Sequence, residues 1–216
     1  MPVKKICRYP SDELKVKTKS FSIEENKNVF KDLYDTIKHY EGVEFITSNQ
    51  IGYDLSVAII DRNAAFKEDN KDIENRYLFL MEPAISEYSK KNISKENENS
   101  ISSSGFSALV ERSNNIQIKF KQLNFKKLNQ EKQDNPDEIK ILAEKFNFDE
   151  FEVSEFNGYM FDNISKTLQR VTDQLNGVCF IDKLTYFNKN RYFKFMNNIK
   201  KLTRGLIQNK QVKSRK

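Results

Sequence analysis

A stretch in the last quarter of the chain, residues 168–182, constrains the fold more than any other. Leu168, Val171 and Leu175 recur there at helical spacing. Gly177 follows at the place where a helix commonly ends, because glycine enters the left-handed conformation without a steric penalty. The pattern therefore predicts a helix that buries one face and ends near Gly177.

Two polar residues of this helix, Arg170 and Gln174, lie one turn apart on the same face. Metal-dependent hydrolases place two His at such positions and a Glu beside the first, in the pattern H-E-x-x-H. Here Val171 stands beside Arg170. A guanidinium has no lone pair for a cation, valine cannot take up a proton, and a carboxamide is a poor zinc ligand. The helix has the spacing of a metal site without its ligands.

The stretch resembles the third motif of peptide deformylases, which reads approximately Q-H-E-x-D-H-L-x-G followed by an apolar run and an Asp. The residues that match this frame are Gln169, Asp173, Leu175, Gly177, Phe180 and Asp182. The segment 49–52 resembles the end of the first motif, G-x-G-L-A-A-x-Q-x-G, with Gln50 at the position that contacts substrate and metal-bound water in the family. Bulkier residues, Phe45 to Ser48, replace the small residues before it.

The second family motif, E-G-C-L-S, can be placed in two ways. The segment 110–112 resembles the V-x-R strand start of the family, and counting back from it without gaps puts the motif on 98–102. Ser100 then replaces the cysteine that binds the metal. A gapped alternative puts the motif on 104–107, around Phe106. Neither placement supplies a cysteine.

The resemblance implies an activity and, at the same time, the loss of its machinery. Peptide deformylases remove the formyl group from the initiator methionine with a metal-activated water. The positions that their motifs assign to this chemistry hold Gln50, Ser100, Arg170, Val171 and Gln174. The sequence thus predicts no catalytic residue, no metal, no cofactor and a protein that is not an enzyme. The alternatives are an active deformylase with a displaced or unusual metal site, and a pocket that binds peptide N-termini without cleaving them.

Arg170 is expected to project into the former metal position, where its charge would substitute for that of the ion. A buried guanidinium needs acceptors, because an unpaired charge away from water is costly. We expect Glu98 to pair with it, or Gln50 and Ser100 to accept hydrogen bonds from it. His39, Cys7 and Cys179 are too few for another convincing metal site or a disulfide framework.

The resemblance also implies an α+β fold, with antiparallel or mixed sheets packed around a central helix and a basic C-terminal helix beyond them. Residues 1–184 would form the deformylase-like domain and 185–216 the basic helix and tail. Surface insertions are expected near 62–75, 89–104 and 126–156.

Hydrophobic periodicity and turn residues predict the individual elements. The expected helices are 22–40, about 158–176 and 186–206, and the expected strands are 53–61, a strand pair within 76–88, 116–125 and 178–184. The segments 63–74 and 89–104 are expected to be loops, 126–138 a charged linker, 139–156 a surface insertion and 210–216 a flexible tail. No apolar run approaches the roughly 20 residues that span a bilayer, and 1–20 is not expected to be a signal peptide.

Charge points to a polyanionic partner. The formal net charge is +6, the isoelectric point is about 9.1, and no Asp or Glu follows Tyr186. The candidate RNA-binding residues are Lys189, Arg191, Lys194, Lys200, Lys201, Arg204, Lys210, Lys213, Arg215 and Lys216. Basic side chains of this kind neutralise phosphates and release counterions, although a solvated basic face is the simpler interpretation of an arbitrary helix.

Bacterial-type deformylases are understood to dock near the ribosomal exit tunnel through a basic C-terminal helix, and the resemblance extends to this segment. It implies a ribosome-associated or ribosomal protein, with rRNA and neighbouring ribosomal proteins as partners and no membrane span. The large subunit of an organellar, mitochondrial ribosome is the expected location, and the bacterial cytoplasm is the alternative. Abundant Asn, Lys, Ile and Phe indicate an AT-rich genome, which suits either setting.

Overall fold

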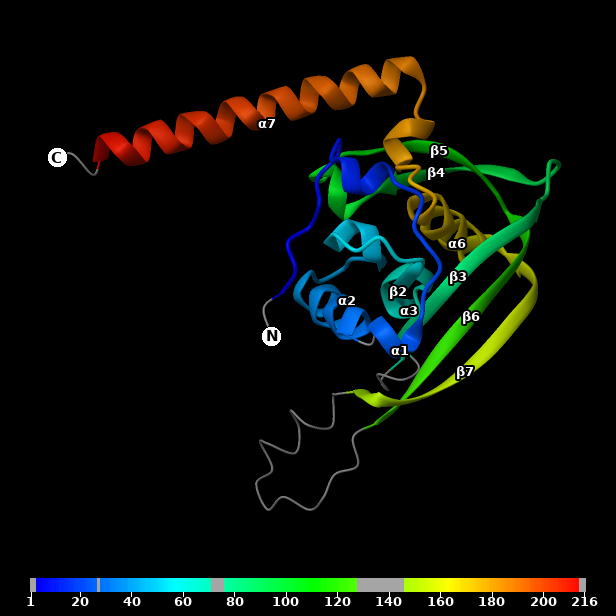
Figure 1. Cartoon of the computed structure of the whole chain (residues 1–216). Helices are drawn as coiled ribbons and strands as arrows, with labels where there is room; N and C mark the ends of the chain where they lie inside the picture. Colours follow the sequence, from blue (N-terminus) through cyan, green and yellow to red (C-terminus); the bar gives the residue numbers. More distant parts are fainter. Residues whose placement is uncertain (1–2, 27, 71–75, 128–145, 214–216) are drawn as a thin grey trace.

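An antiparallel sheet of five strands forms the centre of the fold in the computed structural model of the chain (Figure 1). The structure describes residues 3–26, 28–70, 76–127 and 146–213. The strand order is β1 (Phe45–Thr47), β2 (Val57–Asp61), β3 (Tyr77–Tyr88), β6 (Asn115–Lys127) and β7 (Phe146–Phe161). A second sheet pairs β4 (Ile93–Asn99) with β5 (Ser107–Ser113), also antiparallel.

Helices lie on both faces of the main sheet, with α2 (Asn28–His39) on one face and α6 (Asp162–Leu175) on the other. The other helices are α1 (Ile23–Asn26), α3 (Arg62–Phe66) and α7 (Tyr186–Lys213). Short 3₁₀ helices are η1 (Asp12–Lys15), η2 (Ser48–Ile51), η3 (Ile101–Ser103) and η4 (Phe180–Lys183). Helix α6 contacts strands of both sheets, which confirms the expected α+β fold around a central helix.

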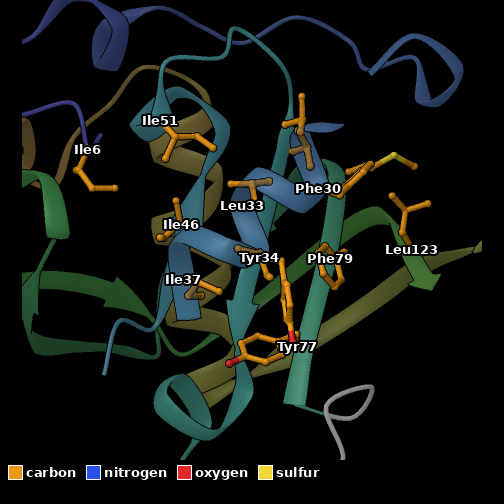
Figure 2. Close-up of a cluster of buried hydrophobic side chains, with 14 residues drawn as sticks. Ile6, Phe30, Leu33, Tyr34, Ile37, Ile46, Ile51, Tyr77, Phe79 and Leu123 are labelled. Atoms are coloured by element: carbon orange, nitrogen blue, oxygen red, sulfur yellow. The ribbon is translucent and has the colours of Figure 1, made fainter. Parts of the chain in front are cut away.

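The alternation of side chains along β2 divides the core in two. Val57 and Ile59 face α2, where they join the cluster in Figure 2. Ala58 and Ile60 face the opposite way, toward α6 and its Val171. A strand buried on both faces reads as a continuous apolar run rather than an alternating one, which explains why its sequence predicted it well.

A third cluster attaches the start of α7 to the second sheet. Tyr192 is 1% exposed and its ring lies 5.2 Å from that of Phe106 and 5.6 Å from that of Tyr9. Beyond this anchor α7 leaves the body of the protein as one long helix (Figure 1). The described helices include none that combines the length and the apolar character needed to span a membrane.

Gly177 lets α6 end against the N-terminal segment. Its φ is +76°, and a Cβ at this position would come within 2.3 Å of the carbonyl oxygen of Lys15. Glycine is thus required for the conformation and for the close approach, as the sequence pattern indicated.

Several predictions from periodicity are confirmed. Strand β6 covers the predicted 116–125, β2 lies within 53–61, and α2 fills most of 22–40, although α1 begins that segment as a separate short helix. Helix α6 ends one residue before the predicted end but begins four residues after the predicted start, because Gly158 belongs to β7. Helix α7 begins as predicted and continues to Lys213, so the described part of the tail is helical.

Other predictions are wrong, for identifiable physical reasons. Residues 93–99 form strand β4 rather than a loop, because backbone pairing with β5 needs few apolar side chains, and Glu98 is the one residue of β4 that is buried. The described part of the predicted surface insertion, 146–156, belongs to β7 of the main sheet. Residues 77–88 form one strand rather than two, α3 overlaps the first part of the predicted loop 63–74, and 180–183 form η4 rather than a strand. The predicted linker 126–138 lies outside the described residues from 128 onward.

Candidate functional site

Arg170, Val171 and Gln174 of helix α6 lie in three different environments. Val171 is fully buried in the core against the main sheet. Gln174 is 5% exposed, and its Nε2 donates a hydrogen bond to the carbonyl oxygen of Leu14 at 3.3 Å. Arg170 lines a cleft between the two sheets, with its side chain 13% exposed. Of Arg170 and Gln174, the two residues at metal-ligand spacing, only Arg170 therefore lines the cleft.

Gln50 is held rigidly on the opposite wall of this cleft. Thr47 caps η2, and its backbone N–H donates to Oε1 of Gln50 at 3.0 Å. This bond turns Nε2 of Gln50 toward two hydroxyl oxygens, Ser100 Oγ at 3.2 Å and Ser102 Oγ at 3.1 Å. Gln50 is 1% exposed, so its amide is oriented before any ligand arrives.

The position of Ser100 decides between the two placements of the second motif. Ser100 caps η3, accepts hydrogen bonds from Gln50 Nε2 and from the N–H of Ser102, and lines the cleft beside Arg170. Phe106 packs instead against Tyr192 in the third cluster. The placement without gaps, with Ser100 at the cysteine position, is the one that agrees with the structure.

Arg170 is surrounded by acceptors. Its Nη1 forms an ion pair with Glu44, its Nη2 donates to the carbonyl oxygen of Asn99 at 2.9 Å, and its Nε lies 3.9 Å from Oε2 of Glu98. The guanidinium also stacks 5.0 Å from the ring centroid of Phe45. The expected pairing with Glu98 is present but long, while Gln50 and Ser100 bond to each other rather than to the arginine.

Behind Arg170 the charges continue into the protein. Glu98, 2% exposed, accepts a hydrogen bond from Nη2 of Arg112 at 2.9 Å. Arg112 also pairs with Asp173 of α6, which in turn lies 3.0 Å from Nζ of Lys183. Burial alone would lower the pKa of Arg112, but its hydrogen bonds to Glu98 and the charge of Asp173 raise that pKa above its ordinary value. We call this set of pairs the buried charge chain; it joins α6, β4, β5 and η4.

The cleft itself has a volume of about 530 Å³ and mixed chemistry. Arg8 and Arg170 supply positive charge, and Glu41 and Glu44 supply negative charge. Ile199 of α7 also lines the cleft. The cleft is large enough for several residues of an extended peptide, and its mouth lies next to the basic helix.

The residues present do not fit the divalent metal ion that the family resemblance implies. Arg170 is a cation with no lone pair to donate, and the amide nitrogen of Gln174 is directed at a backbone carbonyl oxygen. Ser100 Oγ already accepts two hydrogen bonds. Within residues 3–26, 28–70, 76–127 and 146–213, no group of three or more His, Cys, Asp or Glu is placed to hold an ion.

The predicted RNA-binding residues lie along α7. Arg191, Lys194, Lys200, Lys201 and Arg204 are exposed, Lys189 is half-buried, and within the described part of the chain none of them forms an ion pair. The helix includes Lys210 and Lys213, whose side chains are not described, and Arg215 and Lys216 lie outside the described residues.

Sequence reasoning missed Glu44 and the stacking of Arg170 on Phe45. The sequence offered only a weak signal for Glu44, an acid directly before the apolar pair Phe45-Ile46. Only the folded chain shows that this cation is Arg170, which is 126 residues away in sequence.

Comparisons with known proteins agree with this geometry. The family model described as polypeptide deformylase matches residues 3–190. A peptide deformylase of Aquifex aeolicus is 36% identical over 118 residues, which are 54% of this chain and 65% of that protein, just under two thirds. A peptide deformylase of Desulfotalea psychrophila is 24% identical over 196 residues, covering 90% of this chain and 95% of the relative.

Solved structures of the same family share the fold. The crystal structure of a peptide deformylase from Legionella pneumophila has a TM-score of 0.66 and 19% identity, covering 94% of this chain and 98% of its own. That of Plasmodium falciparum peptide deformylase has a TM-score of 0.65 and 18% identity, covering 93% and 98%. At these identities the likeness concerns the fold.

These comparisons overturn one prediction from the sequence. The prediction that the chain is not an enzyme is wrong, because the matched family and the relatives named above are all peptide deformylases, which are enzymes. The residues at the substituted ligand positions determine which donor groups the cleft contains. They do not by themselves show that the chain differs in function from the enzymes it resembles.

The buried charge chain makes a testable contribution to stability. Replacing Arg112 by Met leaves Glu98 charged and buried, which we expect to lower the free energy of unfolding by about 3–5 kcal/mol. Arg112→Met combined with Glu98→Gln removes the orphaned charge and should recover part of the loss. Urea denaturation at pH 7 measures both.

The matched control is the exposed pair of Lys95 and Glu111, 3.7 Å apart in the same small sheet. Lys95→Met should cost about 0–1 kcal/mol, as exposed pairs do. Equal losses for Arg112→Met and Lys95→Met would contradict the importance of the charge chain.

Proposed function

The chain belongs to the polypeptide deformylase family, and we propose that it acts at the ribosome, where α7 binds ribosomal RNA and the cleft receives the N-terminal end of a protein chain. The observation that carries this proposal is the unbroken basic character of α7. Eight Lys or Arg and no acid occur in its 28 residues, namely Lys189, Arg191, Lys194, Lys200, Lys201, Arg204, Lys210 and Lys213.

The arrangement of these charges supports binding to RNA rather than a structural role within the chain. The exposed basic side chains of α7 lack ion pairs within the described residues, so neutralising a phosphate breaks no existing pair. Each phosphate contact releases condensed counterions, and this supplies affinity without reading a base sequence. Exposed apolar side chains on the same helix, Phe193 and Leu202, are 47% and 69% exposed and add a surface for neighbouring ribosomal proteins.

The base of α7 fixes its direction relative to the cleft. Tyr192 packs between Tyr9 and Phe106, and its hydroxyl donates to the carbonyl oxygen of Tyr9 at 3.4 Å. Ile199 then lines the cleft about two turns further along the helix. A surface that binds α7 would hold the cleft beside it, which suits a site for chains that emerge from a ribosome.

The cleft offers groups that suit a peptide end. Glu44 and Arg170 present a carboxylate and a guanidinium at the surface of the cleft, and Gln50 lines it with Nε2 hydrogen-bonded to the hydroxyl oxygens of Ser100 and Ser102. Backbone amides and carbonyls of an extended peptide can pair with such mixed donors and acceptors. We propose the ribosome of an organelle as the partner, with a bacterial cytoplasm as the alternative setting; the composition suits either one.

Ribosome sedimentation at several salt concentrations tests the role of α7. We expect the full chain to pellet with ribosomes at low salt, and the variant Lys194→Gln, Lys200→Gln, Lys201→Gln to bind more weakly. Because each lost phosphate contact contributes about 0.7–0.9 to the slope of log K against log salt, the slope should fall by about 2 to 3.

Three exposed lysines of the body provide the control for charge alone. Lys5→Gln, Lys17→Gln and Lys95→Gln together change the net charge equally and should leave the slope unchanged. If both triple variants lose the same affinity, net charge and not α7 determines binding. If the wild-type chain stays in the supernatant at low salt, the proposal fails.

A second candidate function is the reaction of the family, hydrolysis of N-formylmethionyl peptides. The observation that favours it is the 36% identity to the Aquifex aeolicus peptide deformylase. Because Ser100, Arg170 and Gln174 do not make a metal site, no catalytic step is derived from them.

Turnover of a formyl-methionyl peptide by the full chain, with zinc, iron or nickel added in turn, tests this candidate. Turnover should fall about 100-fold or more in Gln50→Glu, which removes an oriented donor from the cleft. Gln122→Glu on β6, outside the cleft, serves as the control. Absence of turnover with every ion would reject the candidate and leave the proposal for α7 standing.

A further inference from the structure

A second hollow, which shares no element with the cleft, is lined by two exposed aromatic rings on one face of the main sheet. Tyr159 and Phe161 lie near the end of β7 and are 57% and 55% exposed. Tyr88, at the end of β3, also lines the hollow, but it pairs with Ile116 and so projects from the α6 face of the sheet. The hollow has a volume of about 750 Å³ and shares no lining residue with the cleft. We call it the aromatic hollow.

The exposure of these rings follows from the register of β7. Phe156 and Met160 pack into the core on the α6 side, so alternation turns Tyr159 and Phe161 to the opposite face. Their partners on β6 are the polar Gln117 and Asn115. The outer face of an antiparallel edge is ordinarily polar, and these rings contribute nothing to a core.

Clustered exposed apolar side chains mark a binding surface more often than chance exposure does. The rim shows what kind of partner suits this one. Lys90 and Lys91 are exposed beside the rings, with Glu87 as the acid among the lining residues. Aromatic rings with lysines beside them are typical of surfaces for single-stranded nucleic acids, where the rings stack on bases and the cations neutralise phosphates.

The spacing of the rings also suits bases. Alternate residues of a strand are separated by about 7 Å, and a stacked base occupies about 3.4 Å. Tyr159 and Phe161 thus leave room for one base to stack between or beside them, while the lysines reach its phosphates. We expect the site to bind RNA of any base sequence, since every base has a flat face on which a ring can stack.

We propose that the aromatic hollow around Tyr159 and Phe161, with Lys90 and Lys91 at its rim, is a binding site for single-stranded RNA. The site lies on β3, β6, β7 and the loop after β3 and includes no residue of α7. It therefore does not depend on the docking of α7, and either proposal can fail alone.

Fluorescence anisotropy of a labelled 12-nucleotide oligouridine with the full chain tests the proposal. Tyr159→Ala combined with Phe161→Ala should weaken binding roughly 5- to 100-fold, the range for losing one stacked base, and leave the salt slope unchanged. Lys90→Gln combined with Lys91→Gln should lower the salt slope by about 1.4. Tyr159→Phe, which keeps a ring, should bind as the wild type does.

Two controls separate the hollow from other surfaces. Val153→Ala removes an exposed side chain of β7 outside the hollow and should change nothing. In the α7 triple variant described above, the aromatic double substitution should still weaken binding by the same factor. If it has no effect in either background, or if duplex RNA binds as tightly as the single strand, the proposal is overturned.

Ultraviolet crosslinking of the wild-type chain to the same oligonucleotide does not depend on the folding of any variant. Crosslinked peptides that contain Tyr159 or Phe161 support the site. Crosslinks confined to α7 or to the cleft overturn it.

Discussion

The ion pairs of Arg170 are the interaction on which the rest of this structure depends. The guanidinium occupies the helix position where a metal ligand would stand, and Glu44, Glu98 and the ring of Phe45 hold it there. Through Glu98 the charge chain continues to Arg112 and then to Asp173, so the cleft wall is tied to both sheets and to α6. Glu98 and Arg112 are almost fully buried, and a buried charge is tolerated only when its neighbours pair with it. Phe45, Glu44 and Arg170 form one contact group at the wall of the cleft.

The sequence predicted the parts of the fold in which burial follows a simple period. Helix α6 and strands β2 and β6 bury regular faces, and their apolar spacing identified them. Strand β4 escaped prediction because backbone pairing holds it while nearly all of its side chains face water. Strand β7 escaped because its acids suggested a surface insertion, although alternate residues such as Phe156 enter the core. Residues that pair over a long sequence separation, such as Glu44 and Arg170, leave no local pattern in the sequence. The sequence therefore identified polar residues of the cleft, such as Gln50, Ser100 and Arg170, but not which of them pair.

Three surfaces of the protein carry different chemistry. The cleft combines paired charges with an oriented amide at Gln50. The exposed basic side chains of α7 form no ion pair within the described residues, and the aromatic hollow at the ends of β3 and β7 offers rings with lysines. The third cluster, around Tyr192, attaches α7 to the body that carries the cleft. The deformylase fold thus holds three surfaces of different chemistry, for which we have proposed RNA and peptide ligands.

Metal titration of the purified chain tests the central claim most directly, since that claim is that an arginine cation fills the position of a metal ligand. Calorimetry with zinc and with iron should show no stoichiometric site in the wild type, and one site in the variant Ser100→Cys, Arg170→His, Gln174→His, in which the three side chains can donate lone pairs. One equivalent of tightly held zinc or iron in the wild type, lost on replacing Ser100 or Gln174, would contradict the account.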